Sequence, residues 1–443
     1  MIILGIETSC DETALSLIEI NGGKNGSPQQ ILRSKTYGGK TKIKILGNEV
    51  LSQIALHKQY GGVFPMLAKR EHAKNLIPLL KKVLEASNFL ESRIKNQESR
   101  KELQNHSNIL QNIGMILERE PELLKQFLEF IPTIERPPID IIAVTAGPGL
   151  EPCLWTGLNF AKALSLVWNM PIIPVNHMEG HIFISLLKRN ENVKTLNYSL
   201  LTINFPALAL LISGGHTELV LIKDWLQYEV VGQTRDDALG EAFDKVARIL
   251  GLPYPGGPEI SALAERARKS TDLQLTRLPI GGQATYDLQL PRPMLKSDNF
   301  DFSFSGLKTA VLYLVKKLPQ NMKESHPRKS AFSISHNPRL QMEIAREFED
   351  AVTEVLVEKV KKAIELYGAE TLILGGGVVA NKNIRAAFEN LASERNIILK
   401  LPAVPHATDN ALMIALAGYF NRNKAVRATT DLFDLKANGN LHF

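Results

Sequence analysis

Cysteine is nearly absent from this chain, with only Cys10 and Cys153 among 443 residues. Two thiols in so long a chain argue against a disulfide scaffold and favour a reducing compartment. Long apolar runs are also missing, since no stretch approaches the roughly 20 residues that a membrane-spanning helix needs. The first residues, Ile2–Ile6, look like a strand and lack the basic region and apolar core of a signal peptide. We therefore expect a cytoplasmic enzyme without a membrane segment.

A strong excess of either charge is absent as well. Lysine and arginine number 52 against 46 aspartates and glutamates, which gives a net charge of +6 and a pI of about 9.0. A mildly basic balance is compatible with a nucleic-acid partner but does not require one. Hydrophobic residues make up 44% of the chain, as in ordinary globular proteins. The length exceeds that of one usual core and predicts two domains.

Two strands joined by a short polar turn occur twice in the chain. The first pair, Ile2–Ile6 and Ala14–Ile20, flanks a turn that is crowded with hydroxyls and carboxylates. The second pair, Ala207–Ile212 and Glu218–Ile222, flanks a glycine-rich turn. This repetition predicts two copies of one fold that face each other across a cleft.

Glycine-rich turns follow predicted strands at three places, Ala146–Gly149, Ser213–Thr217 and Gly375–Asn381. The first of them lies between a strand at Ile139–Thr145 and a helix predicted over Gly157–Trp168. Strand, glycine-rich turn and helix in succession are typical of an α/β fold. Such folds bind ligands at the carboxyl ends of their strands, where glycine lets backbone N–H groups approach a phosphate.

Other segments are predicted with less bearing on chemistry. A helix that Asp236 would cap runs to Leu250, and helical periodicity covers Leu340–Leu366. Ser87–Pro138 is highly charged with apolar residues at helical spacing, which predicts an inserted helical hairpin. Asn21–Gly47 and Leu318–Pro338 look like further insertions, the former a long loop or an irregular hairpin extension.

The pair His177 and His181 stands out because the two histidines are four residues apart, directly after an apolar strand. On a helix this spacing puts both imidazoles on one face, where they can hold one zinc or ferrous ion. Two ligands leave a site incomplete, and Asp409 in Pro405–Asn410 is the candidate for the third. A histidine pair on a half-buried helix can equally be structural, and this alternative stays open at the level of spacing.

Eight motifs in one fixed order carry a resemblance that spans Ile2 to about Phe420. They are Glu7–Thr13, Asn176–His181, Leu211–Thr217, Gly240–Lys245, Tyr254–Pro258, Asp301–Thr309, Gly375–Asn381 and Thr408–Asn410. Together they resemble the tRNA threonylcarbamoyltransferase family in its bacterial TsaD form, whose members were once described as O-sialoglycoprotein endopeptidases. One departure is Glu151–Pro152, where small apolar residues are usual.

The resemblance implies a fold and a reaction. The fold is a two-lobed actin-like ATPase (ASKHA) type, a duplicated ribonuclease H-like α/β fold with a nucleotide cleft between the lobes. Residues 1–205 with 402–443 would form the metal-carrying lobe, with a helical insertion around 87–138. Residues 206–401 would carry most nucleotide-binding loops. The reaction moves the threonylcarbamoyl group of threonylcarbamoyl-adenylate to N6 of the adenosine 3′ of the anticodon, in tRNAs that read codons beginning with A.

The resemblance also implies site residues and cofactors. The family's metal ligands match His177, His181 and Asp409, with Fe²⁺ as the expected metal and Zn²⁺ as the alternative. Asp11 would lie near the metal or the acceptor amine. The positions that match the family's adenylate-binding residues are Leu211, Ile212, Ser213, Gly214, Gly215, Asp244, Gly257 and Asn381. Expected partners are tRNA, a smaller paralogous TsaB-type subunit and a TsaE-type P-loop ATPase.

Three rival functions fit parts of the sequence. A phosphotransferase of the same superfold would use ATP and Mg²⁺ held by carboxylates, whereas this chain offers two imidazoles. A zinc metalloprotease needs glutamate directly after the first histidine, where this chain has Met178. A scaffold subunit without activity would have no use for a complete ligand set. A metal-dependent acyltransferase acting on tRNA is therefore the predicted function.

Overall fold

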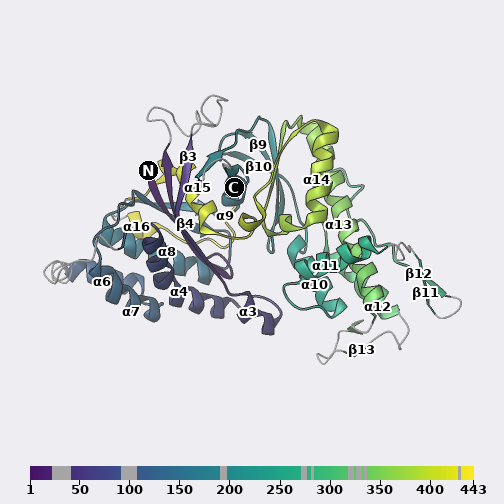
Figure 1. The fold of residues 1–443 in the computed structure, drawn as a ribbon, viewed down its shortest axis with the longest axis horizontal. Coiled ribbons are helices and arrows are strands. Elements are labelled where there is room, and N and C mark those ends of the chain that lie inside the picture. The colour runs from purple at the N-terminus through teal and green to yellow at the C-terminus, as the bar shows by residue number, and fades with distance from the viewer. Residues whose placement is uncertain are drawn as a thin grey trace. The chain divides into compact units, whose positions relative to one another are not determined.

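The computed structural model describes residues 1–21, 41–90, 107–189, 197–270, 277–280, 284–317, 324–325, 332–333, 337–427 and 431–443. These residues form two units (Figure 1). Unit 1 comprises Met1–Ile203 and Asp409–Phe443, and unit 2 comprises Asn204–Thr408. The chain thus leaves unit 1, completes unit 2 and returns to unit 1 at Asp409.

Unit 1 is built on a seven-stranded sheet with the order β5-β4-β1-β2-β3-β7-β6. Strands β1, β2, β3, β7 and β6 are antiparallel neighbours, while β4 and β5 run parallel to β1. Their bounds are β1 Ile2–Glu7, β2 Glu12–Asn21, β3 Lys42–Ser52, β4 Ile141–Gly147, β5 Ile172–Asn176, β6 Leu187–Arg189 and β7 Asn197–Leu200. The parallel half of the sheet is apolar and buried, as parallel strands covered on both faces are.

Helices cover both faces of this sheet. On one face, Leu4 and Ile6 of β1 share a core with α4 (Pro65–Ala86), α6 (Ser107–Ile116), α7 (Pro121–Phe130) and α8 (Glu151–Trp168). Side chains alternate along a strand, so Gly5 faces the other way, where α15 (Ala411–Phe420) packs. A Cβ on Gly5 would lie 2.2 Å from the carbonyl oxygen of Ala411, so this close approach requires glycine. The short helix α9 (His177–Ile184) packs against α15.

Unit 2 is built on a five-stranded sheet with the order β10-β9-β8-β15-β16. The strands are β8 Ala207–Ile212, β9 Thr217–Asp224, β10 Gln227–Gln233, β15 Thr371–Gly375 and β16 Ile398–Lys400. Five helices accompany them, α10 Leu239–Leu250, α11 Gly256–Lys269, α12 Ser305–Lys317, α13 Pro338–Tyr367 and α14 Lys382–Arg395. Two short hairpins, β11–β12 (Arg277–Ile280, Ala284–Asp287) and β13–β14 (Glu324–Ser325, Phe332–Ser333), complete the described strands.

The two sheets share one topology. In unit 1, β3-β2-β1 are antiparallel, and β4 and β5 continue parallel to β1. In unit 2, β10-β9-β8 are antiparallel, and β15 and β16 continue parallel to β8. Sequence order, neighbours and strand directions therefore coincide, which is the duplicated ribonuclease H-like arrangement. The predicted α/β fold class and the predicted duplication are confirmed.

Two predicted helix starts are wrong. The helix predicted from Gly157 begins at Glu151, because Pro152 occupies the first turn, where a missing N–H costs no hydrogen bond. The helix that Asp236 was expected to cap begins at Leu239, where Thr217 Oγ1 accepts a hydrogen bond from Leu239 N at 2.9 Å and Asp236 makes no cap. The Asp236 carboxylate instead accepts hydrogen bonds from the backbone N–H groups of Phe304 and Ser305, at the start of α12. Asp236 thus caps a helix distant in sequence.

Within the predicted helical hairpin at 87–138, α6 and α7 are present, and residues 91–106 lie outside the described part of the chain. The predicted loop at Asn21–Gly47 falls mainly on 22–40, also outside it, although β3 begins at Lys42. Most of the predicted insertion at Leu318–Pro338 lies outside it too.

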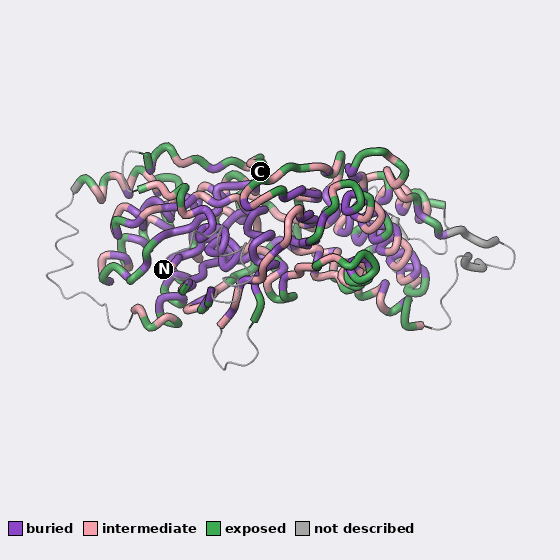
Figure 2. The backbone as a smooth tube through the Cα atoms, turned by 90° about the horizontal axis from the view of Figure 1, so that it is seen from above, coloured by how far each residue is buried: buried purple, intermediate pink, exposed green. Residues whose placement is uncertain are grey.

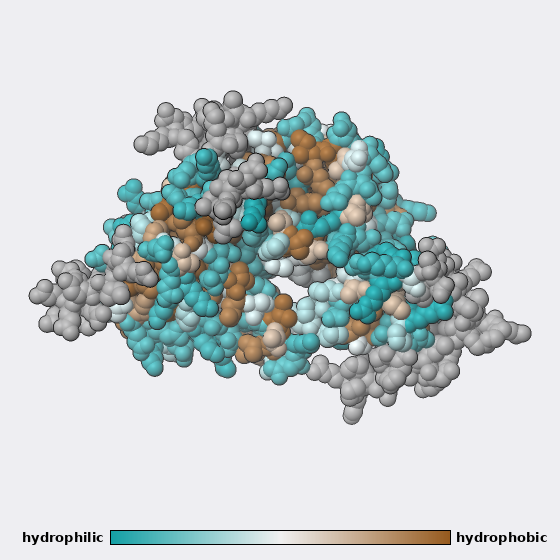
Figure 3. All heavy atoms as spheres, viewed as in Figure 1, coloured by the Kyte–Doolittle hydropathy of each residue, from teal (hydrophilic) through white to brown (hydrophobic). Residues whose placement is uncertain are grey.

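The central strands β1, β4, β8 and β15 are almost wholly buried, whereas β3 and β10 are largely exposed or intermediate, as are many residues of helices and loops (Figure 2). On the face shown in Figure 3, hydrophobic residues form small patches among mostly hydrophilic ones. Among the described helices, none is both long enough and apolar enough to cross a bilayer.

Candidate metal centre and adenylate loops

The two histidines lie where the sequence predicts them, on one turn of α9. This helix starts directly after β5, and the Asn176 side chain caps it by accepting a hydrogen bond from Met178 N at 2.8 Å. His177 is its first residue and His181 its fifth, so both imidazoles lie on one face. Asp409 directly precedes Asn410, which caps α15 in the same way through Met413 N at 3.0 Å. Two capped helices thus place the three side chains.

The three side chains converge within unit 1. His177 Nε2 lies 3.3 Å from Asp409 Oδ1, and His181 Nε2 lies 3.1 Å from the same oxygen. The ring centroids of His177 and His181 are 4.8 Å apart with perpendicular planes. One ligand atom from each residue can be chosen so that all three lie within 4.8 Å of one another. The three predicted ligands therefore lie close enough together to hold one metal ion.

The donor set fits a metal ion. Among the described residues, neither ring nitrogen of the buried His181 has a hydrogen-bond partner. Its Nε2 is within ion-pair distance of Asp409 Oδ1, but the ring is not aligned for an N–H···O bond. An orphaned buried imidazole costs free energy unless another partner satisfies it. Two imidazoles and a carboxylate directed at one point are ligands that Zn²⁺ and Fe²⁺ accept.

Glu7 is a site residue that the sequence reasoning missed. It is fully buried at the end of β1, and its Oε2 lies 3.0 Å from His177 Nδ1 and accepts a hydrogen bond from Thr145 Oγ1 at 2.6 Å. Its Oε1 accepts from the backbone N–H of Ser9. A carboxylate on Nδ1 selects the tautomer that leaves Nε2 as the lone-pair donor. Glu7 thus orients His177 toward Asp409.

The electrostatics of this cluster favour an added positive charge. Burial would lower the pKa of His177, but the carboxylates of Asp409 and Glu7 raise it well above its ordinary value. Burial would likewise raise the pKa of Asp409, but the neighbouring His177 and His181 lower it well below its usual range. Two carboxylates around two imidazoles therefore attract either a proton or a metal ion.

Asp11 lies in the turn between β1 and β2 and is 8% exposed. Its backbone carbonyl accepts a hydrogen bond from Gln53 N at 2.9 Å. Burial, together with the carboxylates of Asp11 and Asp409, raises the pKa of Cys10 well above its ordinary value. Asp11 therefore shares the electrostatic environment of the candidate metal centre.

In unit 2, the predicted adenylate loop joins β8 to β9. Leu211 and Ile212 are fully buried in β8, so only their backbone is available to a ligand. Ser213 N donates to His216 O at 2.9 Å and closes the turn. A Cβ added to Gly214 or Gly215 would meet no atom within 4 Å, so their backbone is approachable.

The other predicted adenylate residues have structural partners. Asp244 Oδ1 accepts from Gly256 N at 2.6 Å and ties α10 to the start of α11, beside the open Gly257. Asn381 caps α14 through Ile384 N at 3.0 Å. Its Nδ2 donates to Ser261 Oγ and Glu349 Oε1, at 2.6 and 2.5 Å. The Asn381 amide is thus already satisfied.

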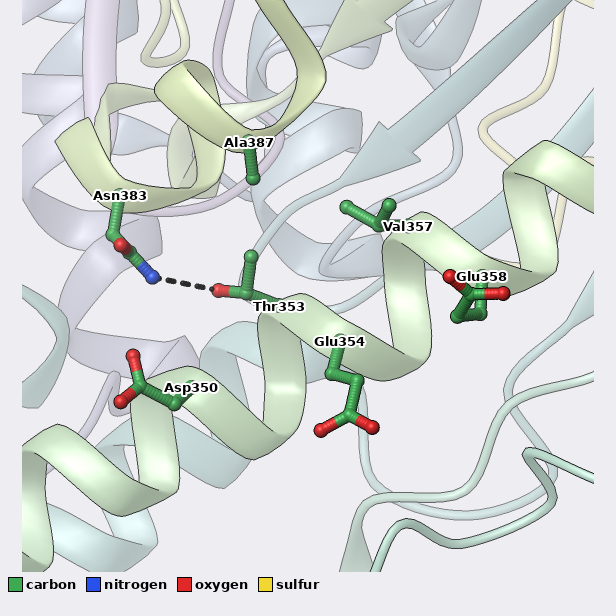
Figure 4. A pocket seen from close by; sticks show the side chains of 7 residues that line it. All are labelled: Asp350, Thr353, Glu354, Val357, Glu358, Asn383 and Ala387. Carbon is green, nitrogen blue, oxygen red and sulfur yellow. Dashed lines mark hydrogen bonds between the residues drawn. The ribbon is translucent and has the colours of Figure 1, made fainter. Parts of the chain in front are cut away.

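A pocket of about 310 Å³ lies elsewhere in unit 2, between α13 and α14 (Figure 4). Asn383 Nδ2 donates to Thr353 Oγ1 at 3.0 Å across it. Its lining residues are Asp350, Thr353, Glu354, Val357, Glu358, Asn383 and Ala387. None of them is a predicted adenylate residue, and three carboxylates disfavour a phosphate. This pocket is not the predicted nucleotide site.

Comparison with known proteins identifies the family. The sequence model of "TsaD: tRNA N6-adenosine threonylcarbamoyltransferase" matches residues 44–95 and 118–416. A tRNA N6-adenosine threonylcarbamoyltransferase of Staphylococcus carnosus is 36% identical, covering 97% of this chain and 94% of that one. The protein of that name from Polynucleobacter necessarius is 37% identical, covering 98% of this chain and 97% of that one.

A solved structure, component A of the Acidaminococcus fermentans (R)-2-hydroxyglutaryl-CoA dehydratase, is similar at a TM-score of 0.41 and 12% identity. It covers 96% of this chain and 99% of that chain. The fold assignment rests on the strand order and not on this likeness. From the sequence comparisons, the chain belongs to the TsaD family of tRNA N6-adenosine threonylcarbamoyltransferases.

Proposed function

We propose that this protein transfers the threonylcarbamoyl group of threonylcarbamoyl-adenylate to the N6 amine of the adenosine 3′ of the anticodon, in tRNAs that read codons beginning with A. The amine nitrogen forms a bond to the carbamoyl carbon and loses a proton. The bond between that carbon and the phosphate oxygen breaks, and AMP leaves. The observation that carries this function is the convergent metal triad in a chain of the TsaD family.

His177, His181 and Asp409 would hold one Fe²⁺ ion per chain, with Zn²⁺ as the alternative. Three protein ligands leave coordination positions open, as in catalytic sites. When bound, the metal supplies Lewis acidity toward the oxygens of the substrate. Glu7 holds the His177 ring in the required tautomer, and Thr145 and the Ser9 amide hold Glu7.

The adenylate would bind to the loops of unit 2. In this assignment, residues 206–401 carry the nucleotide and residues 1–205 with 402–443 carry the metal. The backbone N–H groups of Gly214 and Gly215 contact the phosphate, since no side chain blocks them. The Asp244 carboxylate accepts a hydrogen bond from a ribose hydroxyl. Gly257 leaves room beside it, and Asn381 acts through the cap of α14.

Asp11 would act on the acceptor. The N6 amine of adenosine is a poor nucleophile, so much of the rate must come from its positioning. Asp11 orients the amine or accepts its proton as a general base. Its burial beside Cys10 and Glu12 keeps it close to the metal cluster.

The partners follow from the family. We propose a cytoplasmic enzyme that works on tRNA with a smaller TsaB-type subunit and a TsaE-type P-loop ATPase. The net charge of +6 supports a polyanionic substrate. The helices α6 and α7 are a candidate partner surface, because they lie in the predicted insertion.

The test is a transfer assay. Purified protein, alone and with the two partner proteins, is incubated with threonylcarbamoyl-adenylate and unmodified tRNA, with and without a chelator. Mass spectrometry of the nucleosides should find threonylcarbamoyladenosine, and chelation should remove it. Asp11→Ala should abolish transfer while adenylate binding stays unchanged. Transfer of a phosphate from ATP without this nucleoside would instead indicate a phosphotransferase.

A further inference from the structure

Behind the Asp11 turn lies a chain of buried polar side chains that no function proposed so far uses. His57, Gln53 and His72 are at most 1% exposed and come from the segment between β3 and the first turns of α4. Buried polar groups of this kind are retained at a cost unless each finds a partner. The hydrogen-bond partners of these three side chains therefore indicate their role.

The hydrogen bonds run in one direction. Phe64 N donates to His57 Nδ1 at 3.3 Å, so the neutral His57 ring carries its proton on Nε2, which lies 3.2 Å from Gln53 Oε1. Gln53 Nε2 lies 3.3 Å from His72 Nδ1 and can only donate. His72 Nε2 lies 3.0 Å from Cys10 O, which can only accept. When both rings are neutral Nε2–H tautomers, every donor in these contacts meets an acceptor. Gln53 Nε2 also donates to the backbone carbonyl of Ala68 at 3.4 Å.

Two further hydrogen bonds connect these side chains to the Asp11 turn and to β2. Thr13 Oγ1, at the start of β2, lies 2.8 Å from His72 Nδ1 and donates to it. The backbone N–H of Gln53 donates to Asp11 O at 2.9 Å. Burial also lowers the pKa of His72 to about 4, which keeps the ring neutral at physiological pH. The backbone carbonyls of Cys10 and Asp11 therefore both accept hydrogen bonds from this group of residues, Cys10 from His72 and Asp11 from Gln53.

We infer that His57, Gln53 and His72 are positioning residues for Asp11, acting as a hydrogen-bonded relay that fixes the backbone of the Cys10–Asp11 turn. This inference rests on the role proposed for Asp11. An error of about 1 Å in a reacting group can cost about 100-fold in rate. A rigid, neutral relay prevents that error without adding charge beside the carboxylates.

The test compares two substitutions at one position. His72→Gln keeps an amide that can donate to Cys10 O, whereas His72→Leu removes the contact. His72→Leu should lower kcat of threonylcarbamoyl transfer by about 100-fold, with KM for tRNA and metal affinity changed by less than about threefold. His72→Gln should recover most of kcat. Gln53→Met, which removes the side-chain amide contacts to both histidines and to Ala68 O, should resemble His72→Leu.

The matched control is Ser165→Ala. Ser165 is a fully buried residue of unit 1 whose hydroxyl donates to Met170 O, remote in sequence from Asp11. If His72→Leu loses activity only as far as Ser165→Ala does at equal thermal stability, the relay is merely structural. Unchanged kcat in His72→Leu would overturn the inference outright.

A second readout separates this inference from the proposed function. In uniformly ¹⁵N-labelled protein, spectra of the wild type should show His57 and His72 as neutral Nε2–H tautomers. His72→Leu should shift the amide signals of Cys10 and Asp11. If the enzyme shows no transfer but these signals behave as stated, the function fails and the relay stands. If the amide signals of Cys10 and Asp11 do not shift, the proposed relay is wrong, whatever the transfer activity of the enzyme.

Discussion

Unit 1 and unit 2 share one strand order but present different chemistry at their strand ends. In unit 1, side chains from β1, α9 and the start of α15 converge, and the candidate ligands His177 and His181 are at most 5% exposed. In unit 2, the predicted site offers open glycine backbone at Gly214, Gly215 and Gly257. Its polar side chains, Asp244 and Asn381, already hold neighbouring elements together.

This difference suits the two units to different kinds of ligand. Buried imidazoles and carboxylates suit a small cation, which must be enclosed by charged or polarisable atoms. Backbone N–H groups at glycines suit an anionic phosphate, which side chains would crowd. We therefore expect substitutions in unit 1 to change metal affinity and substitutions in unit 2 to change adenylate affinity.

The largest expected effect is the loss of a metal ligand. His181→Ala or Asp409→Ala should weaken Fe²⁺ or Co²⁺ binding by on the order of 1,000-fold, more than the 10- to 100-fold typical of an outer residue. Binding of AMP should change by less than about threefold. Calorimetric titration of both ligands into the same variants measures this. If metal binding and AMP binding weaken equally, the assignment of metal binding to unit 1 and adenylate binding to unit 2 is wrong.

The pH dependence of unit 1 should come partly from His72. Its folded pKa of about 4 lies below the unfolded value near 6.5, so the unfolded state binds the proton first as the pH falls. Stability is thus lost between about pH 6.5 and pH 4, by about 3 kcal/mol at pH 4. His72→Gln should remove this share of the pH dependence.

Urea unfolding in the presence of a chelator measures the contribution of His72 to the pH dependence of stability. In a Trp225→Phe background the fluorescence reports on unit 1, because Trp155 and Trp168 both lie on α8. The difference between this protein and its His72→Gln variant isolates the histidine from the carboxylates. A constant difference from pH 7 to pH 4 would mean that folding does not lower the pKa of His72.

The third effect concerns Glu7. Glu7→Gln keeps an acceptor for His177 Nδ1 but loses the charge, and it should weaken metal binding by about 10-fold, while Glu7→Ala should weaken it by about 100-fold. Glu120→Gln is the control, since Glu120 is a buried carboxylate of unit 1 that pairs with Lys69 and not with a histidine. If substitution of Glu7 leaves the metal affinity unchanged, Glu7 does not contribute to metal binding, and only His177, His181 and Asp409 do.

The smallest effect tests unit 2. Asn381→Ala removes the cap of α14 and should lower the free energy of unfolding by about 1 kcal/mol. Asn381→Ser keeps a capping oxygen but loses the amide that binds Glu349. If Asn381 acts only through the cap, AMP affinity should survive in Asn381→Ser and fall in Asn381→Ala. AMP affinity that equals that of the unsubstituted protein in both variants would leave Asn381 outside the site, whereas an equal loss in both would assign the amide a role.

Local spacing was sufficient for part of this picture. The interval between His177 and His181 predicts two imidazoles on one helical face, and the repeated strand pairs predict two sheets of one topology. Both predictions are confirmed by the coordinates. Local patterns work here because helical period and strand alternation depend on neighbouring residues alone.

Long-range contacts were beyond such reasoning. Glu7 meets His177 across 170 positions, and His72 meets Cys10 across 62. Nothing in the spacing of single acidic or histidine residues tells which ones a sheet will bring together. Asp409 was a candidate ligand from its motif and was matched to the family's metal aspartate, but spacing could not place it beside the histidines, because more than 200 residues separate them. Asp236 was misassigned for the same reason, since the helix it caps is 69 residues downstream.

The measurement that tests the central claim most directly is X-ray absorption of the Fe²⁺-loaded protein. The account predicts one iron per chain, with two imidazole rings and at least one carboxylate oxygen in the scattering shells. His181→Ala should remove one imidazole from that signal. A spectrum of bound iron without imidazole scattering, or one that His181→Ala leaves unchanged, would contradict it.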